Sequence, residues 1–267
     1  MKKNHTSLLL ITGILLLLSA CSKIIYKGVW QAEPVKADGI PDEWSKPLRF
    51  YDNTTKLQYA FTNDKRTIYV CIRATDEQTQ KKILAGGLQL WIDTTGKGKE
   101  KTGILFPMPV AIEKTEGNGT SKKEDNPEDY KPRKSTRLTG NEMQLSGFKA
   151  PVGGIVPLQN MDGIMVNIKM DKDEILNYEA LIPFKTFYHD SLRPSDTTQI
   201  FSLKIQVNGI PQQKKNNDQN DPSHSMGSRT AGGMGARGGT RGGGMGPSNP
   251  MAESHSVTAR FKMIYKP

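Results

Sequence analysis

The sequence predicts an all-β protein, an antiparallel β-sandwich of jelly-roll-like type with long disordered loops inserted into it. First, apolar residues alternate with polar ones in many short segments, as expected for strands with one buried face. Second, Gly, Asn, Asp and Pro turns separate these segments, which is typical of a sandwich. Third, no stretch of comparable length has the helical 3.6-residue period; only 75–84 and 183–188 suggest short helical turns.

The alternating segments are the expected strands, and each is recognised by its apolar positions. In chain order these are Leu57, Tyr59 and Phe61; Ile68, Val70 and Ile72; Leu88, Leu90 and Ile92; Ile164, Val166, Ile168 and Met170; Ile175 to Ile182; Phe201, Leu203, Ile205 and Val207; and Val257, Ala259, Phe261, Met263 and Tyr265. Because the last segment runs almost to the end of the chain, we expect the C-terminus to be part of the sheet.

The N-terminus has the order of a secretory signal: Lys2 and Lys3, an apolar stretch from Leu8 to Leu18, then small residues before Cys21. The apolar stretch is shorter than the ~20 residues that a spanning helix needs. Leu-Ser-Ala-Cys resembles the bacterial lipobox, which implies that the Cys21 thiol is lipidated and residues 1–20 are removed. The alternatives are an ordinary signal peptide with an incidental Cys and a membrane helix at the start of the chain.

We therefore expect an exported lipoprotein, and residues 21–29 are interpreted as its lipidated tether. No acidic cluster follows Cys21; such clusters resemble surface-export signals, so we expect an outer-membrane anchor with the protein facing the periplasm. The whole chain has a formal net charge of +10. Its lysines are scattered, which favours a role in solubility over one concentrated binding segment. Cys71 has no second Cys to pair with, and we expect it to be a small buried residue.

One domain is expected over residues 30–267, with two loop insertions. Residues 113–137 are rich in Lys, Glu, Asp, Pro and Gly and offer little to bury. Residues 211–256 include a Gly-rich stretch with Arg and Met, whose ordering entropy burial cannot offset. Because this second segment stands between two good strands, it is expected to be an inserted loop rather than a tail.

A series of short motifs resembles the family 9 carbohydrate-binding modules, a β-sandwich family. The motifs are Asp38–Trp44 (an Asp-Gly-x-x-Asp-Glu-x-Trp-like opening), Leu57–Asn63 and Thr67–Ala74 as a hairpin, Gly87–Asp93 ending in Ile-Asp, Glu179–Pro183, and Phe201–Asn208 containing Gln-Val-Asn. The resemblance covers most of residues 30–267 and implies a non-catalytic sandwich that binds poly- or oligosaccharide. Independently, Trp44 is expected to be structural, packing at one end of the sandwich beside an acidic turn.

Trp91 is the main candidate for sugar binding. It alternates against Leu88, Leu90 and Ile92, so it is expected on the opposite face of its strand together with Gln89 and Asp93. An aromatic ring there can stack on a sugar ring while amides and carboxylates bind hydroxyls; equally, Trp91 can pack beneath the 113–137 loop. Gln206 and Asn208 match polar positions of the family's penultimate strand and complete the predicted site.

The sequence departs from the family at its sugar clamp, which the resemblance implies is built from two aromatic rings. The first position falls in 80–85 and the second in the 211–256 loop, and neither contains an aromatic residue. An alternative function is therefore adhesion or assembly, with the sugar site lost and the Gly/Arg/Met-rich loop binding a partner or an anionic polymer. Arg229, Arg237 and Arg241 lie among its glycines. Because the chain is expected to be exported, we expect no nucleic-acid partner.

Metal handling and catalysis are weaker interpretations. The loop region holds soft and borderline ligands that suit Cu(I), namely Met226, Met234, Met245, Met251, His224 and His255. Asp64, Asp76 and Asp93 could contribute to a Ca²⁺ site, although turn roles are favoured for them. No carboxylate pair stands out as the one that glycoside hydrolysis needs, and His189 has no evident nucleophile, so no enzyme is expected.

Overall fold

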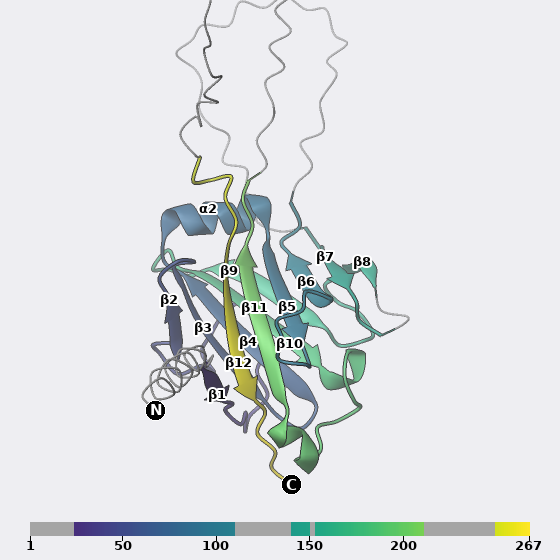
Figure 1. Ribbon diagram of the computed structural model, residues 1–267. Coiled ribbons are helices and arrows are strands. Elements are labelled where there is room, and N and C mark those ends of the chain that lie inside the picture. Colours follow the sequence, from purple (N-terminus) through teal and green to yellow (C-terminus); the bar gives the residue numbers. More distant parts are fainter. Residues whose placement is uncertain (1–23, 110–139, 150–152, 211–248) are drawn as a thin grey trace, which may run out of the picture.

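The alternating apolar segments form strands, as predicted, in the computed structural model, which describes residues 24–109, 140–149, 153–210 and 249–267 (Figure 1). The strands are β1 (Ile25–Lys27), β2 (Phe50–Asp52), β3 (Leu57–Asn63), β4 (Thr67–Ala74), β5 (Leu88–Asp93), β6 (Thr102–Phe106), β7 (Glu142–Ser146), β8 (Gly154–Pro157), β9 (Met165–Met170), β10 (Leu176–Pro183), β11 (Ile200–Val207) and β12 (His255–Lys262). The helix is α2 (Glu77–Gly86), and the 3₁₀ turns are η2 (Phe184–Thr186) and η3 (Pro194–Thr198).

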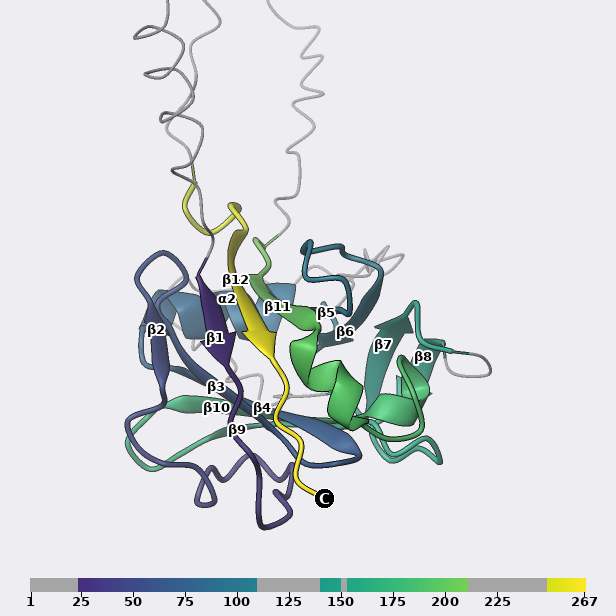
Figure 2. The ribbon, with the colours of Figure 1, turned by 60° about the horizontal axis from the view of Figure 1, so that its bottom comes forward.

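Two sheets form the sandwich, which confirms the predicted fold class. The seven-stranded sheet has the order β1-β12-β11-β5-β6-β7-β8, and the five-stranded sheet has the order β2-β3-β4-β10-β9. Neighbouring strands are antiparallel except β1 and β12, which pair in parallel. Figure 2 shows the sheets as two layers, with β12 and β11 in one and β3, β4 and β10 in the other.

The core lies between the layers, where the alternate residues of each strand meet. Leu57, Val70, Leu90 and Phe106 are fully buried in one continuous apolar cluster. Helix α2 lies at one end of the sandwich (Figure 1) and contributes Ile83 to the same cluster. This helix and η2 confirm the helical turns predicted in 75–84 and 183–188. Burial of apolar surface between the sheets is the main stabilising term of such a fold.

The predicted tether of residues 21–29 is wrong in its described part, because Ile25–Lys27 forms β1 at the edge of the seven-stranded sheet. The backbone N–H of Gly28 donates to the carbonyl of Lys262, 2.8 Å away, and continues this pairing. Tyr26 points inward, and its ring centroid lies 4.7 Å from that of Phe50 on β2. These contacts tie the start of the described chain to both sheets.

The segment 30–49 covers the outer face of the five-stranded sheet, and Figure 2 shows it as a further layer beneath β3, β4 and β10. Val35, Trp44 and Leu48 pack on Ala60, Tyr69 and Cys71 of β3 and β4 in a second buried apolar cluster. Trp44 is thus structural, as expected, but the expected position at one end of the sandwich is wrong. Cys71 is buried and free, also as expected.

Glu179 on β10 holds this covering segment in place. Its carboxylate accepts the indole N–H of Trp44 at 2.8 Å and the backbone N–H of Gly39 at 2.9 Å. Burial raises the pKa of Glu179 to about 7, although the two hydrogen bonds act in the opposite direction. Two of the family-like motifs, 38–44 and 179–183, therefore meet in one buried contact.

The two predicted insertions lie mostly outside the described residues, which exclude 110–139 and 211–248. The expected end of the second insertion is too late, because His255 and Ser256 already belong to β12. The residues on either side of the 211–248 gap are hydrogen-bonded to each other: the N–H of Ile210 donates to the carbonyl of Met251 at 2.7 Å. The Lys82 ammonium of α2 donates to the carbonyl of Pro250 at 3.3 Å and also to that of Glu253.

Candidate functional site

The outer face of the seven-stranded sheet carries the predicted site residues. Leu88, Leu90 and Ile92 of β5 are buried, whereas Gln89 and Trp91 point away from the core and are half-buried. In the register between β5 and β11, Gln206 lies opposite Gln89, Lys204 opposite Trp91 and Ser202 opposite Asp93. The structure therefore brings Gln89, Trp91 and Gln206 together on adjacent strands of one face.

Trp91 lies over Gly103 of β6, its partner on the other side. A Cβ atom on Gly103 would fall 2.8 Å from Cδ2 of Trp91, so the glycine leaves the space that the indole occupies. The indole N–H is shielded from solvent and has no acceptor within the described part of the chain. Because a shielded, unpaired N–H is unfavourable, the position requires an explanation beyond stability. The exposed part of Trp91 is carbon surface, which suits stacking.

The amides of the site form a short chain of hydrogen bonds. Gln206 Nε2 donates to Asn208 Oδ1 at 2.9 Å, and Asn208 Nδ2 donates to the carbonyl of Gly86 at 3.1 Å. Gly86 ends α2, so this network fixes the orientation of Gln206 against the helix end. Asn208 thus orients Gln206, which lies opposite Gln89 on the outer face of the sheet.

Asp93 is held by its own loop rather than presented to a ligand. Its oxygens accept backbone N–H groups of Thr95 at 2.9 Å, Lys97 at 2.8 Å and Gly98 at 2.8 Å. Burial alone would raise the pKa of the Asp93 carboxyl, but the hydrogen bonds from Thr95, Lys99 and Lys97 lower it overall. The observed geometry gives Asp93 a structural role in the turn that follows β5.

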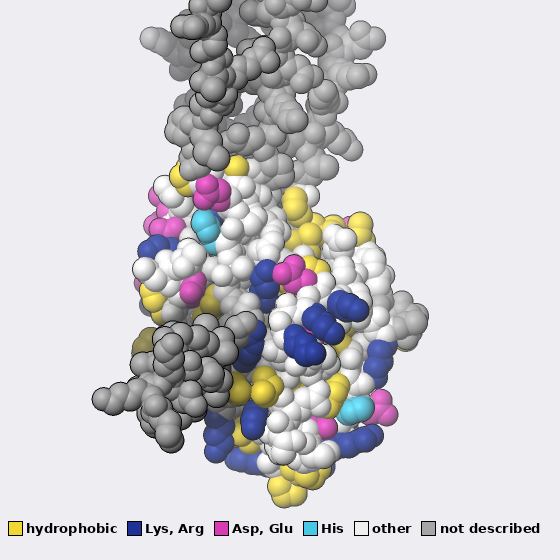
Figure 3. Space-filling view, in the orientation of Figure 1, with side chains coloured by type: hydrophobic (Ala, Val, Ile, Leu, Met, Phe, Trp, Pro, Cys, Tyr) yellow, Lys and Arg dark blue, Asp and Glu magenta, His cyan; other side chains and the backbone are white. Residues whose placement is uncertain are grey.

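Lys204 and Glu100 belong to the same face but are not among the predicted site residues. Lys204 lies opposite Trp91 in the register between β11 and β5. Its Nζ lies 2.5 Å from Oε1 of Glu100. Figure 3 looks onto this side of the molecule and shows Lys and Arg side chains gathered over its middle. Lys204 precedes Gln206 by two positions on β11, so period-two alternation places both on the same face. The sequence could therefore have identified Lys204 as a site residue. Nothing in the sequence signals Gly103, because β6 lacks a recognisable alternation.

The Ca²⁺ site considered for Asp64, Asp76 and Asp93 is not formed, because the three carboxylates lie on three separate turns. Asp64 accepts the backbone N–H groups of Arg66 and Thr67 in the β3–β4 turn. Asp76 caps α2 by accepting the N–H of Thr79 at 2.8 Å. Over the described ranges, no group of three or more His, Cys, Asp or Glu side chains could hold a metal ion.

Other predicted features lie partly or wholly outside the described residues. Of the Cu(I) ligand candidates, the structure describes only Met251 and His255; His224, Met226, Met234 and Met245 fall in the 211–248 gap. The same gap contains Arg229, Arg237 and Arg241 and the second position of the aromatic clamp. The first clamp position forms α2, where Gln80 Nε2 donates to the carbonyls of Ala74 and Glu174.

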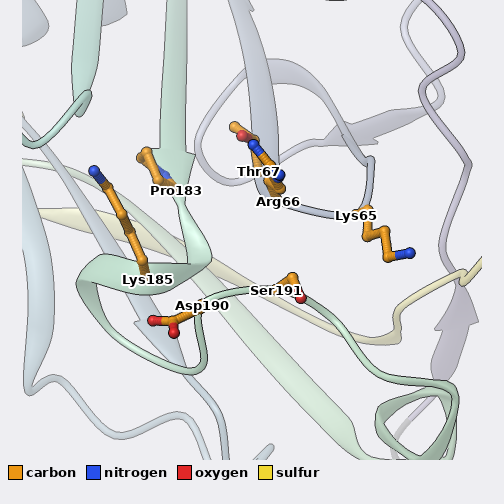
Figure 4. A pocket seen from close by; sticks show the side chains of 7 residues that line it. All are labelled: Lys65, Arg66, Thr67, Pro183, Lys185, Asp190 and Ser191. Carbon is orange, nitrogen blue, oxygen red and sulfur yellow. The ribbon is translucent and has the colours of Figure 1, made fainter.

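A hollow at the end of the β3–β4 hairpin is lined by Lys65, Arg66, Thr67, Pro183, Lys185, Asp190 and Ser191. Its basic side chains do not converge: Figure 4 shows Lys65 and Lys185 extending away from each other. The Lys65 ammonium lies 5.4 Å from the centroid of the Tyr265 ring instead. We therefore do not assign this hollow as an anion site.

No protein-family model, curated protein or solved structure matches the chain. In the part of the chain that the structure describes, no helix has the length and apolarity to cross a membrane.

Proposed function

We propose that this protein is an exported, lipid-anchored, non-catalytic protein of the bacterial envelope that binds glycan on the outer face of its seven-stranded sheet. The observation that carries the glycan proposal is the setting of Trp91. Its half-buried ring lies over Gly103 on the outer face of the sheet, its N–H has no acceptor among the described residues, and Gln89 and Gln206 lie on the same face. The ring offers a stacking surface for the apolar face of a sugar, and the amides can bind the hydroxyl groups.

The carboxylates of this face support a binding role rather than a hydrolytic one. Glycoside hydrolysis requires two carboxyl groups facing the bond to be cut. Asp93 is occupied by the N–H groups of its own loop, and Glu100 is paired with Lys204. The resemblance to family 9 modules favours the same conclusion, although the site proposed here lies on the sheet face and not at the family's aromatic clamp.

The glycan proposal is tested by calorimetric titration of the chain from Ser22 onward, which retains every described element. Cello-, xylo- and pectic oligosaccharides form the panel. We expect binding to at least one class and a loss of about tenfold or more in affinity for Trp91→Ala, because a central aromatic ring contributes strongly to binding. Tyr51→Ala removes another exposed aromatic ring, from β2, and should bind as the wild type does. No binding across the panel by the folded chain contradicts the proposal.

The anchor is proposed at Cys21, on the periplasmic side of the outer membrane. It rests on the lipobox-like Leu18-Ser19-Ala20-Cys21 sequence after an apolar stretch. Mass spectrometry of the membrane-extracted protein should show cleavage before Cys21 and acyl chains on that residue. Cys21→Ser should move the protein out of the lipid-modified fraction. A mature chain that begins elsewhere and carries no lipid contradicts this part of the proposal.

A further inference from the structure

The described chain begins with an unusual group of exposed apolar side chains. Ile24 is 70% exposed, Ile25 45% and Val29 41%, and they lie within six consecutive positions in and around the edge strand β1. Single exposed apolar residues are normal on a protein surface, whereas a local group of them indicates an interaction site.

We propose that this edge docks onto a bilayer surface that contains anionic lipids. The proposed surface, called the β1 edge below, consists of Ile24, Ile25, Val29, Lys27, Arg49 and Lys266. Apolar side chains flanked by cations match the boundary between acyl chains and anionic headgroups.

The three cations of the β1 edge lie on β1 itself or on residues that contact its neighbourhood. Lys27 is exposed on β1 itself and lies beside Lys262 in the register with β12. The Arg49 guanidinium donates to the carbonyl of Lys27 at 2.8 Å. The Lys266 ammonium lies 5.9 Å from the centroid of the Trp30 ring. None of these side chains has an acidic partner among the described residues, so their charge is available to a negative surface.

Chain length supplies a second argument, which rests on the proposed lipid anchor at Cys21. Four residue steps separate Cys21 from Ile25, and an extended chain covers at most about 14 Å over that length. Because Ile25 is already part of the sheet, a lipidated Cys21 would hold the β1 edge against the headgroup region. The edge that a short anchor brings to the membrane is thus the edge with exposed apolar and basic side chains.

The opposite edge of the sandwich provides a matched control. It also exposes apolar residues, with Ile155 on β8 at 62%, Met161 at 100% and Met165 on β9 at 42%. The shallow hollow around Met161 and Met165 includes Asp162 and no Lys or Arg in its lining. If apolar exposure alone decided membrane binding, the two edges would behave alike; the proposal requires the β1 edge to dominate.

The test uses the unlipidated chain from Ser22 onward in vesicle flotation. Vesicles of phosphatidylcholine alone are compared with vesicles that also contain phosphatidylglycerol, at low and at physiological salt. We expect partition onto the anionic vesicles that weakens with salt. Each cation near such a surface contributes about fivefold to the partition constant. Lys27→Ser with Lys266→Ser should therefore weaken it at least tenfold, and Ile24→Ser with Ile25→Ser should also weaken it.

The control variant Ile155→Ser with Met161→Ser should float as the wild type does. Absence of wild-type partition onto anionic vesicles at low salt overturns the proposal, as does an equal loss for variants of the two edges. The chain used carries no lipid and no glycan is present, so this result is independent of acylation at Cys21 and of sugar binding. If the glycan proposal or the anchor proposal is wrong, calorimetry or mass spectrometry will show it, and the flotation result is unaffected.

Discussion

The two outer faces of the sandwich differ in what covers them. The face of the five-stranded sheet lies beneath residues 30–49, which bury Trp44 to 7% exposure. On the face of the seven-stranded sheet, Trp91 is only half-buried. The same residue type thus has two roles. Trp44 donates its N–H to a buried carboxylate, whereas the N–H of Trp91 has no acceptor in the described structure. The satisfied N–H of Trp44 agrees with a packing role, whereas the N–H of Trp91, unpaired among the described residues, supports the binding role that we propose for it.

The largest effect is expected from truncating Trp44, with truncation of Trp91 as the comparison. Trp44→Ala should lower the free energy of unfolding by about 3–5 kcal/mol. It leaves a cavity between residues 30–49 and the five-stranded sheet, and it removes a hydrogen-bond donor from buried Glu179. Trp91→Ala should lower the free energy of unfolding by only about 1–2 kcal/mol, since Trp91 is partly exposed and its N–H has no acceptor among the residues that the structure describes. Urea unfolding at one pH measures both. Equal losses would show that the two faces are structurally equivalent.

The covered face should also make stability depend on pH. The folded-state pKa of Glu179 is about 7 against an ordinary value of 4.5, so the folded state binds the proton more tightly. The stability from this proton is complete below pH 4.5 and is lost as the pH rises through about 7, amounting to about 3 kcal/mol. Urea unfolding between pH 4.5 and 8 should show this decline in the wild type. Glu179→Gln should flatten it, and an unchanged pH profile in that variant would contradict the assignment.

A glycine substitution probes the open face without removing its aromatic ring. The Cβ of Gly103→Ala would overlap the Trp91 indole and approach the carbonyl of Leu90 to 2.8 Å. We expect a loss of about 1–2 kcal/mol in unfolding free energy, as for other overpacked sites. Glycan affinity should fall about as far as in Trp91→Ala, because the added methyl group displaces the ring from the position that it occupies over Gly103. Calorimetry checks this, with Gly98→Ala as the comparison, because a Cβ atom on Gly98 would contact only Thr258, at 3.9 Å. Gly98 has a φ of +78°, so Gly98→Ala itself costs stability, and only the glycan affinities of the two variants are compared.

The smallest effect is expected for the ion pair on the open face. Lys204 and Glu100 are 19% and 46% exposed, and such pairs contribute less than about 1 kcal/mol. A double-mutant cycle with Lys204→Ala and Glu100→Ala should give a coupling free energy in that range, falling as salt increases. A coupling well above it would mean that this pair, rather than Trp91, organises the face.

Much of the fold could be predicted because one physical signal, period-two alternation, marks the central strands. Leu57–Asn63 and Ile200–Val207 have long runs in which large apolar residues alternate with other residues, and both form strands. β1 and β2 have three residues each, too short for a period to show, and β8 exposes its apolar Ile155. The tether prediction failed for this reason: only tertiary contacts such as Tyr26 with Phe50 turn Ile25–Lys27 into a strand.

The candidate site could be predicted in part by the same signal. Alternation placed Gln89 and Trp91 on the outer face, and the register then set Gln206 beside Gln89. It could not show that Asp93 is occupied by its own turn, because those bonds depend on the local path of residues 94–99. Nor could it pair Trp44 with Glu179, which lie 135 residues apart in sequence. Contacts of that kind follow from sheet topology and not from any local pattern.

The central claim is that Trp91, and not Trp44, faces the ligand. The most direct test is a titration of the chain from Ser22 onward with tryptophan indoles labelled by ¹⁵N, followed by NMR against the oligosaccharide panel. The peaks are assigned with the variants Trp91→Phe and Trp44→Phe. We predict that the indole N–H signal of Trp91 shifts with a glycan that binds, while that of Trp44 stays in place. A bound glycan that shifts Trp44 and leaves Trp91 unchanged, or a panel that shifts neither, would contradict the claim.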